Sequence, residues 1–328
     1  MEKKHIRFIF VAVLVSVFTV SLTISNAAAE KADTSAWAAT DAYIKENVKG
    51  EKPLSGAEEK SKKLVAVKVD AGPVIDGKID DVWGQAQGVY VWDTVAKINI
   101  MLKTVYTDGK IFLLVKFNDP DESRKHKYWH WNKEEEMYEQ GPEREDIFTV
   151  KWNMNPGEVD LSAHADNEYR ADIWFWKSNR TGPVGYADDK IQKLTVAEIK
   201  GQMKVISRSG NIRYLTRIAD EGRSAYEYEL PIDHAGDIIP KYTNRQPQGS
   251  RADVKAKGFW KDGSWAIEFK RDLATGNSDD VQFDISSEYQ LGVSRYEISA
   301  RKPNLKTEVP LYGSGDTNNS LRLSFDKK

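Results

Sequence analysis

The sequence predicts an all-β protein, and three observations support this prediction. Short runs of alternating or β-branched residues recur from Leu64 to the carboxyl end, turn-forming residues separate these runs, and no long helical pattern lies between them. The chain of 328 residues is long enough for one large domain. We therefore expect an antiparallel β-sandwich with a few short helices in its loops.

The amino end has the pattern of an export signal. Positively charged residues precede an apolar stretch at residues 8–24, and small residues follow it up to Ala29. This order of charged, apolar and small residues is typical of a cleaved signal peptide. We expect a signal peptide at residues 1–29 and a periplasmic protein, which stays off the membrane unless this segment is retained as an anchor.

A different composition marks residues 30–63, which are rich in Ala, Lys, Glu and Ser. Trp37 and Tyr43 have a spacing that is compatible with one face of a helix. We expect a short amphipathic helix at Ser35–Val48 and then a charged linker, followed by the β-domain at residues 64–328.

Turn signals bound the expected strands, and Asp108-Gly109 between two of them is a strong hairpin signal. Pro120–Arg144 and Pro231–Lys257 do not fit the strand pattern. Because both are long for loops, we expect them to carry function or short helices. The ten clearest strands are expected at Leu64–Asp70, Asn99–Thr107, Lys110–Asn118, Ile147–Asn153, Glu168–Lys177, Met203–Ser207, Ala225–Leu230, Ser264–Arg271, Tyr289–Tyr296 and Leu321–Phe325.

The composition excludes several kinds of site. The absence of cysteine rules out disulfides, thiolate-held zinc or iron–sulfur clusters, a thiol nucleophile and covalently attached c-type haem. The formal net charge of −2 gives no basis for nucleic acid binding, which needs clustered positive charge. Any metal or cofactor must therefore be held by other side chains.

Familiar catalytic motifs do not occur in the sequence. It contains no Gly-rich phosphate loop, GxSxG elbow or HExxH motif, and its five histidines lack the spacing of zinc ligands. The acidic pairs Glu145/Asp146, Asp188/Asp189 and Asp279/Asp280 are adjacent, and neighbours on a strand point to opposite faces. We interpret these pairs as surface charge, and an enzyme acting alone is the least favoured function.

Tryptophan is concentrated in the middle of the chain, where it forms two W-x-W runs, Trp129-His130-Trp131 and Trp174-Phe175-Trp176. On a strand the two indoles of each run lie side by side on one face. They are either fillers of the sandwich core, or the wall of a flat cofactor pocket or a platform for stacking sugars.

The segment Ala71–Trp83 contains the pattern P-x-I-D-G-x-x-D-x-x-W and resembles the first strand and turn of family-9 carbohydrate-binding modules and their relatives. With later segments, the chain from about Leu64 to about Ile298 resembles the haem-binding domain of the ethylbenzene dehydrogenase gamma-subunit family. The later segments are Asn118–Pro120, Trp129 and Trp131, Gly141–Asp146, Asp172–Lys177, Arg180, Gly185–Asp189, Trp265, Arg271–Leu273 and Asp280–Phe283.

This resemblance implies an immunoglobulin-like β-sandwich that holds one non-covalent haem b and passes single electrons. In the named case the domain works beside a molybdopterin catalytic subunit and an iron–sulfur subunit. The resemblance therefore implies a non-catalytic electron-transfer subunit of an oxidoreductase.

The resemblance also implies iron ligands, which are a Met and a Lys in the dehydrogenase subunits. Met101 matches the methionine, and Lys177 is the better candidate for the lysine, with Lys270 as second choice. A lysine binds iron only as the neutral amine, so burial has to lower its pKa. Relatives that use histidine often read Trp-His-Trp-Lys where this chain has Phe175, so His130 or nearby His126 is the alternative ligand.

Further residues of the expected haem pocket are aromatic or basic. Trp174 and Trp176 would form its wall, and Arg180 and Arg271 would pair with the haem propionates.

Two other functions remain open. A haem-free module of the same fold would stack a carbohydrate or another planar ligand on the aromatic pairs, and Asp76, Asp80 and Asp81 would hold a structural Ca²⁺ through oxygen ligands. A periplasmic protein whose sandwich only supports assembly with a partner is the third function.

Overall fold

The structure is a computed structural model that describes residues 52–93, 96–198, 202–296, 314–317 and 320–326. The expected signal peptide and the expected helix at Ser35–Val48 lie outside the described residues. In the part of the chain that the structure describes, no helix has both the length and the apolar character needed to cross a membrane.

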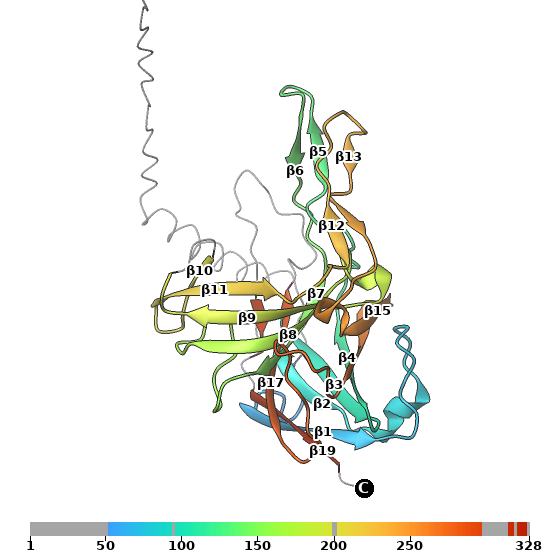
Figure 1. The fold of residues 1–328 in the computed structure, drawn as a ribbon, viewed down its shortest axis with the longest axis vertical. Coiled ribbons are helices and arrows are strands. Elements are labelled where there is room, and N and C mark those ends of the chain that lie inside the picture. The colour runs from blue at the N-terminus through green and yellow to red at the C-terminus, as the bar shows by residue number, and fades with distance from the viewer. Residues whose placement is uncertain (1–51, 94–95, 199–201, 297–313, 318–319, 327–328) are drawn as a thin grey trace, which may run out of the picture.

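One fourteen-stranded sheet forms most of the described chain (Figure 1). Its strands are β1 (Ser61–Lys68), β2 (Val89–Asp93), β3 (Ile98–Tyr106), β4 (Lys110–Asn118), β7 (Ile147–Asn153), β8 (Tyr169–Lys177), β9 (Asp188–Thr195), β10 (Met203–Ile206), β11 (Ile212–Ala219), β15 (Lys255–Lys261), β16 (Ser264–Asp272), β17 (Tyr289–Tyr296), β18 (Ser314–Asp316) and β19 (Ser320–Phe325). The order is β10-β11-β9-β8-β7-β17-β19-β1-β3-β4-β16-β15, with β18 beside β17 and β2 beside β3.

The sheet folds over so that β7 and β8 pack against β4 and β16. Ring contacts join the two layers: the centroids of Trp176 and Trp265 are 5.0 Å apart, and those of Phe117 and Phe148 are 5.7 Å apart. Alternate residues of each strand enter this interior, as the period of two in a strand requires. The result is the β-sandwich that the sequence predicts, with a dense aromatic core between the layers.

Each layer also carries an apolar cluster on its outer face. Outside β8 and β9, Phe175 and Leu194 belong to one cluster. Outside β3 and β4, Phe112 and Leu114 belong to another, which includes Trp83 of the short 3-10 helix η1 (Asp81–Gln85). Both faces of these strands are therefore covered.

An arm projects from the sandwich (Figure 1). It consists of a three-stranded sheet of β13 (Ile238–Ile239), β5 (Trp129–Asn132) and β6 (Met137–Gln140), and a ribbon of β12 (Tyr226–Tyr228) with β14 (Tyr242–Asn244). We expected short helices in Pro120–Arg144 and Pro231–Lys257. The first segment contains β5 and β6 instead, and the second contains β13, β14 and one short 3-10 helix at Ser250–Ala252. These strands have two to four residues each, and β13 pairs with β5 across more than a hundred residues, so they leave little local pattern. The two further 3-10 helices are η2 (Gly182–Val184) and η3 (Ser250–Ala252).

All ten expected strands occur, with ends that differ by a few residues. The Asp108-Gly109 hairpin also occurs, because β3 and β4 pair in register up to Tyr106 opposite Ile111. One detail differs from a purely antiparallel sandwich: β1 lies between β19 and β3 and pairs with both in parallel.

A candidate functional site around Lys177

Strand β8 separates an apolar interior from a charged site on its other face. Trp174 and Trp176 point into the core, and both are completely buried. Phe175 and Lys177 alternate with them and point to the opposite side. Lys177 therefore stands at the end of β8, outside the core, yet only 1% of its side chain is exposed.

Lys177 is held by one carboxylate and by aromatic rings. Its Nζ donates a hydrogen bond of 2.6 Å to Asp188 Oδ2 and one of 3.1 Å to the hydroxyl of Tyr226. The same nitrogen lies 4.6 Å from the ring centroid of Phe175 and 4.8 Å from that of Tyr226. Burial lowers the pKa of Lys177 to about 8, although Asp188 acts in the opposite direction.

Asp188 is the carboxylate at the centre of this site. It pairs with Phe175 across the β8–β9 ladder, so it shares the outer face with Lys177. Lys190 Nζ lies 3.1 Å from Asp188 Oδ2, and Arg251 Nη2 lies 2.6 Å from Oδ1. Burial by itself would raise the pKa of Asp188, but these cations and Lys177 hold it well below its usual range.

A second ion pair lies beside the first. Arg180 pairs with the buried Glu145, which also accepts the backbone N–H groups of Asn179 and Arg180. The Arg180 guanidinium lies 5.3 Å from the ring of Tyr226 and 5.2 Å from the ring of Tyr242. The ribbon of β12 and β14, which supplies both tyrosines, thus covers the site.

His126 closes the side near Glu145. Its side chain is buried, with 5% exposed, and its ring centroid lies 5.8 Å from that of Tyr242. Its Nδ1 lies 3.5 Å from Glu145 Oε1 and has no hydrogen-bond partner. Burial, and then the nearby positive charges of Arg180 and other basic residues, lower the pKa of His126 far below neutrality. The imidazole is therefore a neutral base.

The site combines aromatic walls with an excess of positive charge. Four basic groups, those of Lys177, Arg180, Lys190 and Arg251, face two carboxylates, those of Asp188 and Glu145. Two buried nitrogen bases, those of Lys177 and His126, lie in the same enclosure. This chemistry suits a planar ligand that carries negative charge and accepts a nitrogen donor.

The structure does not bring Met101 to this site. Ile100 and Leu102 point into the core, so Met101 points to the outer face of β3, where it packs against the Trp83 and Phe112 cluster. Lys177 points outward from the opposite layer. Because stacked sheets are about 10 Å apart, these two side chains do not meet at one iron atom.

Lys270 shares the outer face with Met101 but is also distant from it. On the intervening strand β4, Met101 pairs with Lys116 and Lys270 stands opposite Phe112. These four positions correspond to about 13 Å along a strand. A Met101–Lys270 pair therefore does not surround one ion in this structure.

The remaining predicted residues have structural partners. Trp174 and Trp176 belong to the core, so they cannot serve as an exposed platform for sugars. Arg271 is buried among carboxylates and bonds Asp172 at 2.6 Å. His130 lies on the arm, 2.6 Å from Glu143 Oε1. Among the expected pocket residues, Lys177 and Arg180 come together beside Tyr226, and Arg271 lies 5.1 Å from the ring of Trp174 at the end of the core.

The sequence analysis missed Asp188, Glu145 and Tyr226 as members of the site. Both carboxylates belong to adjacent acidic pairs that we interpreted as surface charge, but each is 1% exposed. For Glu145 the available signal was its position just before the apolar strand Ile147–Asn153, whereas the strand that begins with Asp188 is mostly polar and gave no such signal. Tyr226 reaches Lys177 only because the ribbon of β12 and β14 packs over the end of β8, and no pattern in the local sequence indicates this packing.

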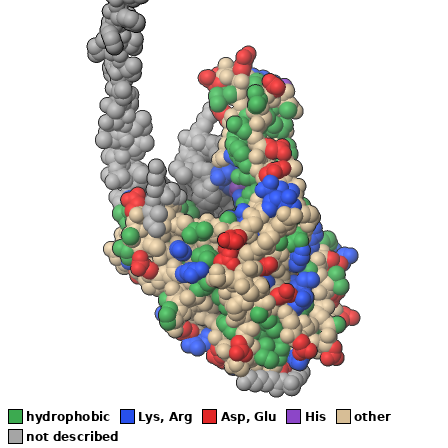
Figure 2. All heavy atoms as spheres, viewed as in Figure 1, with side chains coloured by type: hydrophobic (Ala, Val, Ile, Leu, Met, Phe, Trp, Pro, Cys, Tyr) green, Lys and Arg blue, Asp and Glu red, His purple; other side chains and the backbone are tan. Residues whose placement is uncertain are grey.

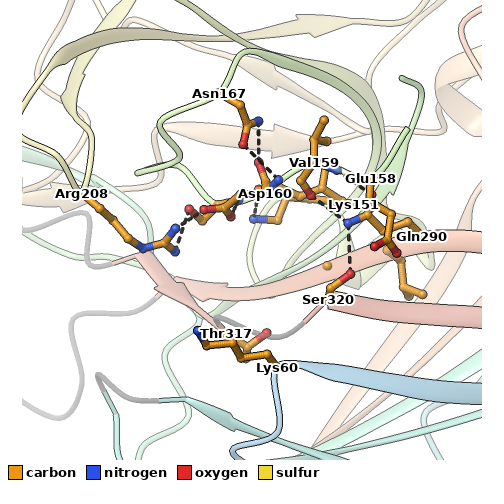
Figure 3. A pocket seen from close by; sticks show the side chains of 14 residues that line it. Lys60, Lys151, Glu158, Val159, Asp160, Asn167, Arg208, Gln290, Thr317 and Ser320 are labelled. Atoms are coloured by element: carbon orange, nitrogen blue, oxygen red, sulfur yellow. Dashed lines mark hydrogen bonds and ion pairs between the residues drawn. The ribbon is translucent and has the colours of Figure 1, made fainter. Parts of the chain in front are cut away.

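A polar hollow of about 620 Å³ lies elsewhere, against β7, β17 and β19 (Figure 3). Arg208 points toward Asp160 there, and Gln290 Nε2 donates to Ser320 Oγ at 3.0 Å. Lys151 donates to the Leu161 carbonyl at 2.7 Å. None of the expected haem ligands lines this hollow.

Asp76, Asp80 and Asp81 do not form the expected calcium site. Asp80 Oδ2 accepts the backbone N–H of Val74, and Asp76 Oδ1 accepts that of Lys78, so these oxygens stabilise their own turn. Within the described residues, the three carboxylates that do converge are elsewhere.

The fold and the site define a β-sandwich domain with a buried, cationic and aromatic site at the end of a central strand. The chain belongs to the ethylbenzene dehydrogenase family, because residues 63–301 match the family of that description. None of the curated proteins matches the chain.

Solved structures with a similar arrangement include a family-9 carbohydrate-binding module from Caldicellulosiruptor kristjanssonii in complex with glucose. It is 10% identical, with 82% of this chain and 97% of that chain covered and a TM-score of 0.37. The module from the same organism in complex with cellotriose is 11% identical, with 81% and 96% covered and a TM-score of 0.37.

Proposed function

We propose that this chain is an exported electron-transfer protein of the ethylbenzene dehydrogenase family that binds haem b at Lys177. The observation that carries the proposal is a buried lysine whose pKa is lowered to about 8 by its surroundings. Lysine binds iron as the neutral amine, and burial lowers the free-energy cost of removing its proton. Bound haem b would supply a reversible one-electron centre.

His126 replaces Met101 in this proposal as the second iron ligand. It is neutral, buried and lies in the same enclosure as Lys177, whereas Met101 lies on the opposite outer face. A neutral imidazole with an unpaired ring nitrogen is a good iron ligand. Ligation by Lys177 requires its hydrogen bonds to Asp188 and Tyr226 to break.

The other residues of the site have roles that follow from their charge and shape. Arg180 is positioned to pair with a propionate, and the excess positive charge balances the two propionates of haem b. Tyr226 and Tyr242 exclude water from the site, which strengthens each of these charge interactions.

A molybdopterin catalytic subunit and an iron–sulfur subunit are the partners that we propose, on the basis of the family. The arm offers a surface for such a partner, since it exposes apolar side chains beside acidic ones (Figure 2). The exposed apolar residues on and near it are Met137, Tyr228, Leu230, Ile232 and Ile238.

Hemin titration of the purified protein tests the haem proposal. We expect a Soret band, and a low-spin spectrum with sharp α and β bands after reduction. Lys177→Leu and His126→Leu should each abolish the low-spin spectrum, whereas the matched controls Lys270→Leu and Met101→Leu should leave it unchanged. A wild-type protein in whose presence the hemin spectrum stays that of free hemin would reject haem binding. Loss of the spectrum in Met101→Leu alone would restore Met101 as the ligand.

The polar hollow favours a second candidate function, the haem-free binding of a small polar ligand such as a sugar. Its volume is in the range of small-molecule sites, and amide, hydroxyl and charged groups line it. Calorimetric titration with glucose and cello-oligosaccharides tests this function. Binding that is lost in Gln290→Ala and retained in Lys177→Leu would support it, and no heat of binding would contradict it.

A further inference from the structure

The inner-facing rows of three strands end in charged residues at one end of the sandwich. On β8 the row of Trp176 and Trp174 continues to Asp172, and on β16 the row of Phe269 continues to Arg271. Asp189 on β9 pairs with Trp174 and therefore faces the same interior. Asp280, in the connection between β16 and β17, completes the group.

The carboxylates of this group converge. One oxygen from each of Asp172, Asp189 and Asp280 lies within 4.8 Å of the other two. The three residues are 1%, 0% and 5% exposed, so water has little access to them. In the part of the chain that the structure describes, no other group of three or more acidic or histidine side chains is close enough together to share an ion.

The protein satisfies only some of these oxygens. Asp172 Oδ2 accepts hydrogen bonds from Arg271 at 2.6 Å and from the backbone of Val281 at 2.9 Å. Asp280 Oδ2 accepts the hydroxyl of Thr275 at 2.5 Å, and its Oδ1 is 3.4 Å from Arg271. Asp172 Oδ1 and both oxygens of Asp189 are buried and have no hydrogen-bond partner.

A completely buried carboxylate with two unpartnered oxygens is costly. Folding removes the carboxylate from water, and no hydrogen bond within the protein replaces those that it made to water. The ionised carboxylate therefore requires a compensating charge. Arg271 is already engaged with Asp172, Asp280 and the Val281 carbonyl. Asp189 therefore points to a positive group that the described part of the chain does not supply.

The charge balance gives the size of that missing positive charge. Three ionised aspartates carry three negative charges and Arg271 carries one positive charge, so the net charge of the group is −2. One divalent cation neutralises this charge. Without a cation the group must hold protons instead, and burial followed by the neighbouring carboxylates raises the pKa of Asp189 well above its usual range.

We propose that Asp172, Asp189 and Asp280 bind a divalent cation of the hard, oxygen-preferring class, with Ca²⁺ as the preferred ion. All donors are carboxylate oxygens, which calcium prefers over nitrogen or sulfur. Two oxygens on opposite sides of a calcium ion are about 5 Å apart, twice the length of a Ca–O bond, so the separation of these carboxylate oxygens suits calcium. Asp220, which is also buried, is a further negative charge near Asp189 but is not one of the three carboxylates that converge.

This site is separate from the proposed haem site and faces the other side of the same strands. Asp188 and Asp189 are neighbours on β9 and point to opposite faces, one to Lys177 and the other to the ion. Bound calcium would stabilise the fold by filling the end of the core, and it does not require haem.

Thermal unfolding of the chelator-treated protein, with and without added calcium chloride, tests the proposal. We expect the melting temperature to rise with calcium concentration, because the ion binds the folded state, and calorimetry to give one ion per chain. Asp189→Asn should abolish this rise and, without calcium, should melt no lower than wild type, because it replaces a carboxyl group that must otherwise take up a proton with a neutral amide of the same shape. Asp272→Asn, next to Arg271 on the exposed side of β16, is the matched control and should keep the full rise.

Two results would overturn the proposal. Equal melting temperatures with chelator and with millimolar calcium would mean that the group holds only protons. A calcium-dependent rise that persists in Asp189→Asn would mean that the ion binds elsewhere. Hemin binding by Lys177 is measured separately, so failure of one proposal leaves the other intact.

Discussion

The ammonium group of Lys177 lies 2.6 Å from a carboxylate oxygen of Asp188, and each side chain is 1% exposed. The antiparallel pairing of β8 with β9 brings the two residues to the same face. The pair is not symmetrical, because Asp188 also contacts Lys190 and Arg251, whereas Lys177 has Asp188 as its hydrogen-bonded carboxylate.

This asymmetry predicts unequal costs of removing the two partners. Asp188→Asn leaves three basic groups without their shared carboxylate, and we expect a loss of about 3–5 kcal/mol in the free energy of unfolding. Lys177→Leu leaves Asp188 with two cations, and we expect a loss of about 1–3 kcal/mol. Chemical denaturation measures both.

The exposed pair Lys110–Asp272, whose charged atoms are 2.8 Å apart, is the control for that comparison. Solvent screens this pair, so its variants should change the free energy of unfolding by less than about 1 kcal/mol. Equal losses for Asp188→Asn and Lys177→Leu would contradict the asymmetry.

The lowered pKa of Lys177 predicts a rise in stability at alkaline pH. The folded state releases the Lys177 proton near pH 8, while the unfolded chain holds it up to about 10.5. Between these values the unfolded state binds more protons, so stability increases with pH through this window. The difference in unfolding free energy between wild type and Lys177→Leu should therefore change from pH 8 to 10, and a constant difference would argue against the shift.

The buried Glu268 predicts the opposite slope in acid. It accepts the Trp83 indole N–H at 2.8 Å and the Gly77 backbone N–H at 2.9 Å, and burial raises its pKa to about 7. The folded state holds this proton between about pH 4.5 and 7 and the unfolded state does not, so stability falls as pH rises through that range. Glu268→Gln should reduce this fall in urea titrations at each pH, whereas an unchanged slope would exclude Glu268 as its source.

Gly258 predicts a packing defect in the core. A Cβ atom at this position would lie 2.4 Å from Cζ2 of Trp176, which the neighbouring Trp265 holds in place. We expect Gly258→Ala to cost about 1–3 kcal/mol through the forced shift of the indole. A Cβ at Gly84 would meet nothing within 4 Å, so Gly84→Ala is the control. Equal melting temperatures for the two variants would show that the indole moves freely.

Much of the sandwich could be predicted from local sequence. The alternation in Asp172–Lys177 predicts both the strand and the common face of Trp174 and Trp176, since a period of two is a property of the strand itself. The arm could not be predicted in this way. Ile238–Ile239 pairs with Trp129–His130 across more than a hundred residues, and so short a strand has no pattern of its own.

The candidate site was predicted only in part. Lys177 and Arg180 were identified through the family resemblance and do lie together, whereas Met101 lies on the other layer. Spacing along the sequence shows which residues share a face of a strand, but it does not show whether that face points toward the core or away from it. Only the folding of the sheet decides this.

By itself, the sequence determined the strands, the faces that their side chains share and the absence of any thiol-based chemistry. The tertiary structure decided which charges meet: Arg271 reaches Asp172 across the sandwich, and Tyr226 of the arm reaches Lys177. Such contacts join residues tens of positions apart, and their strength depends on burial. The local sequence pattern encodes neither these long-range contacts nor the burial of the charged groups, because both arise only when the two layers and the arm pack against one another.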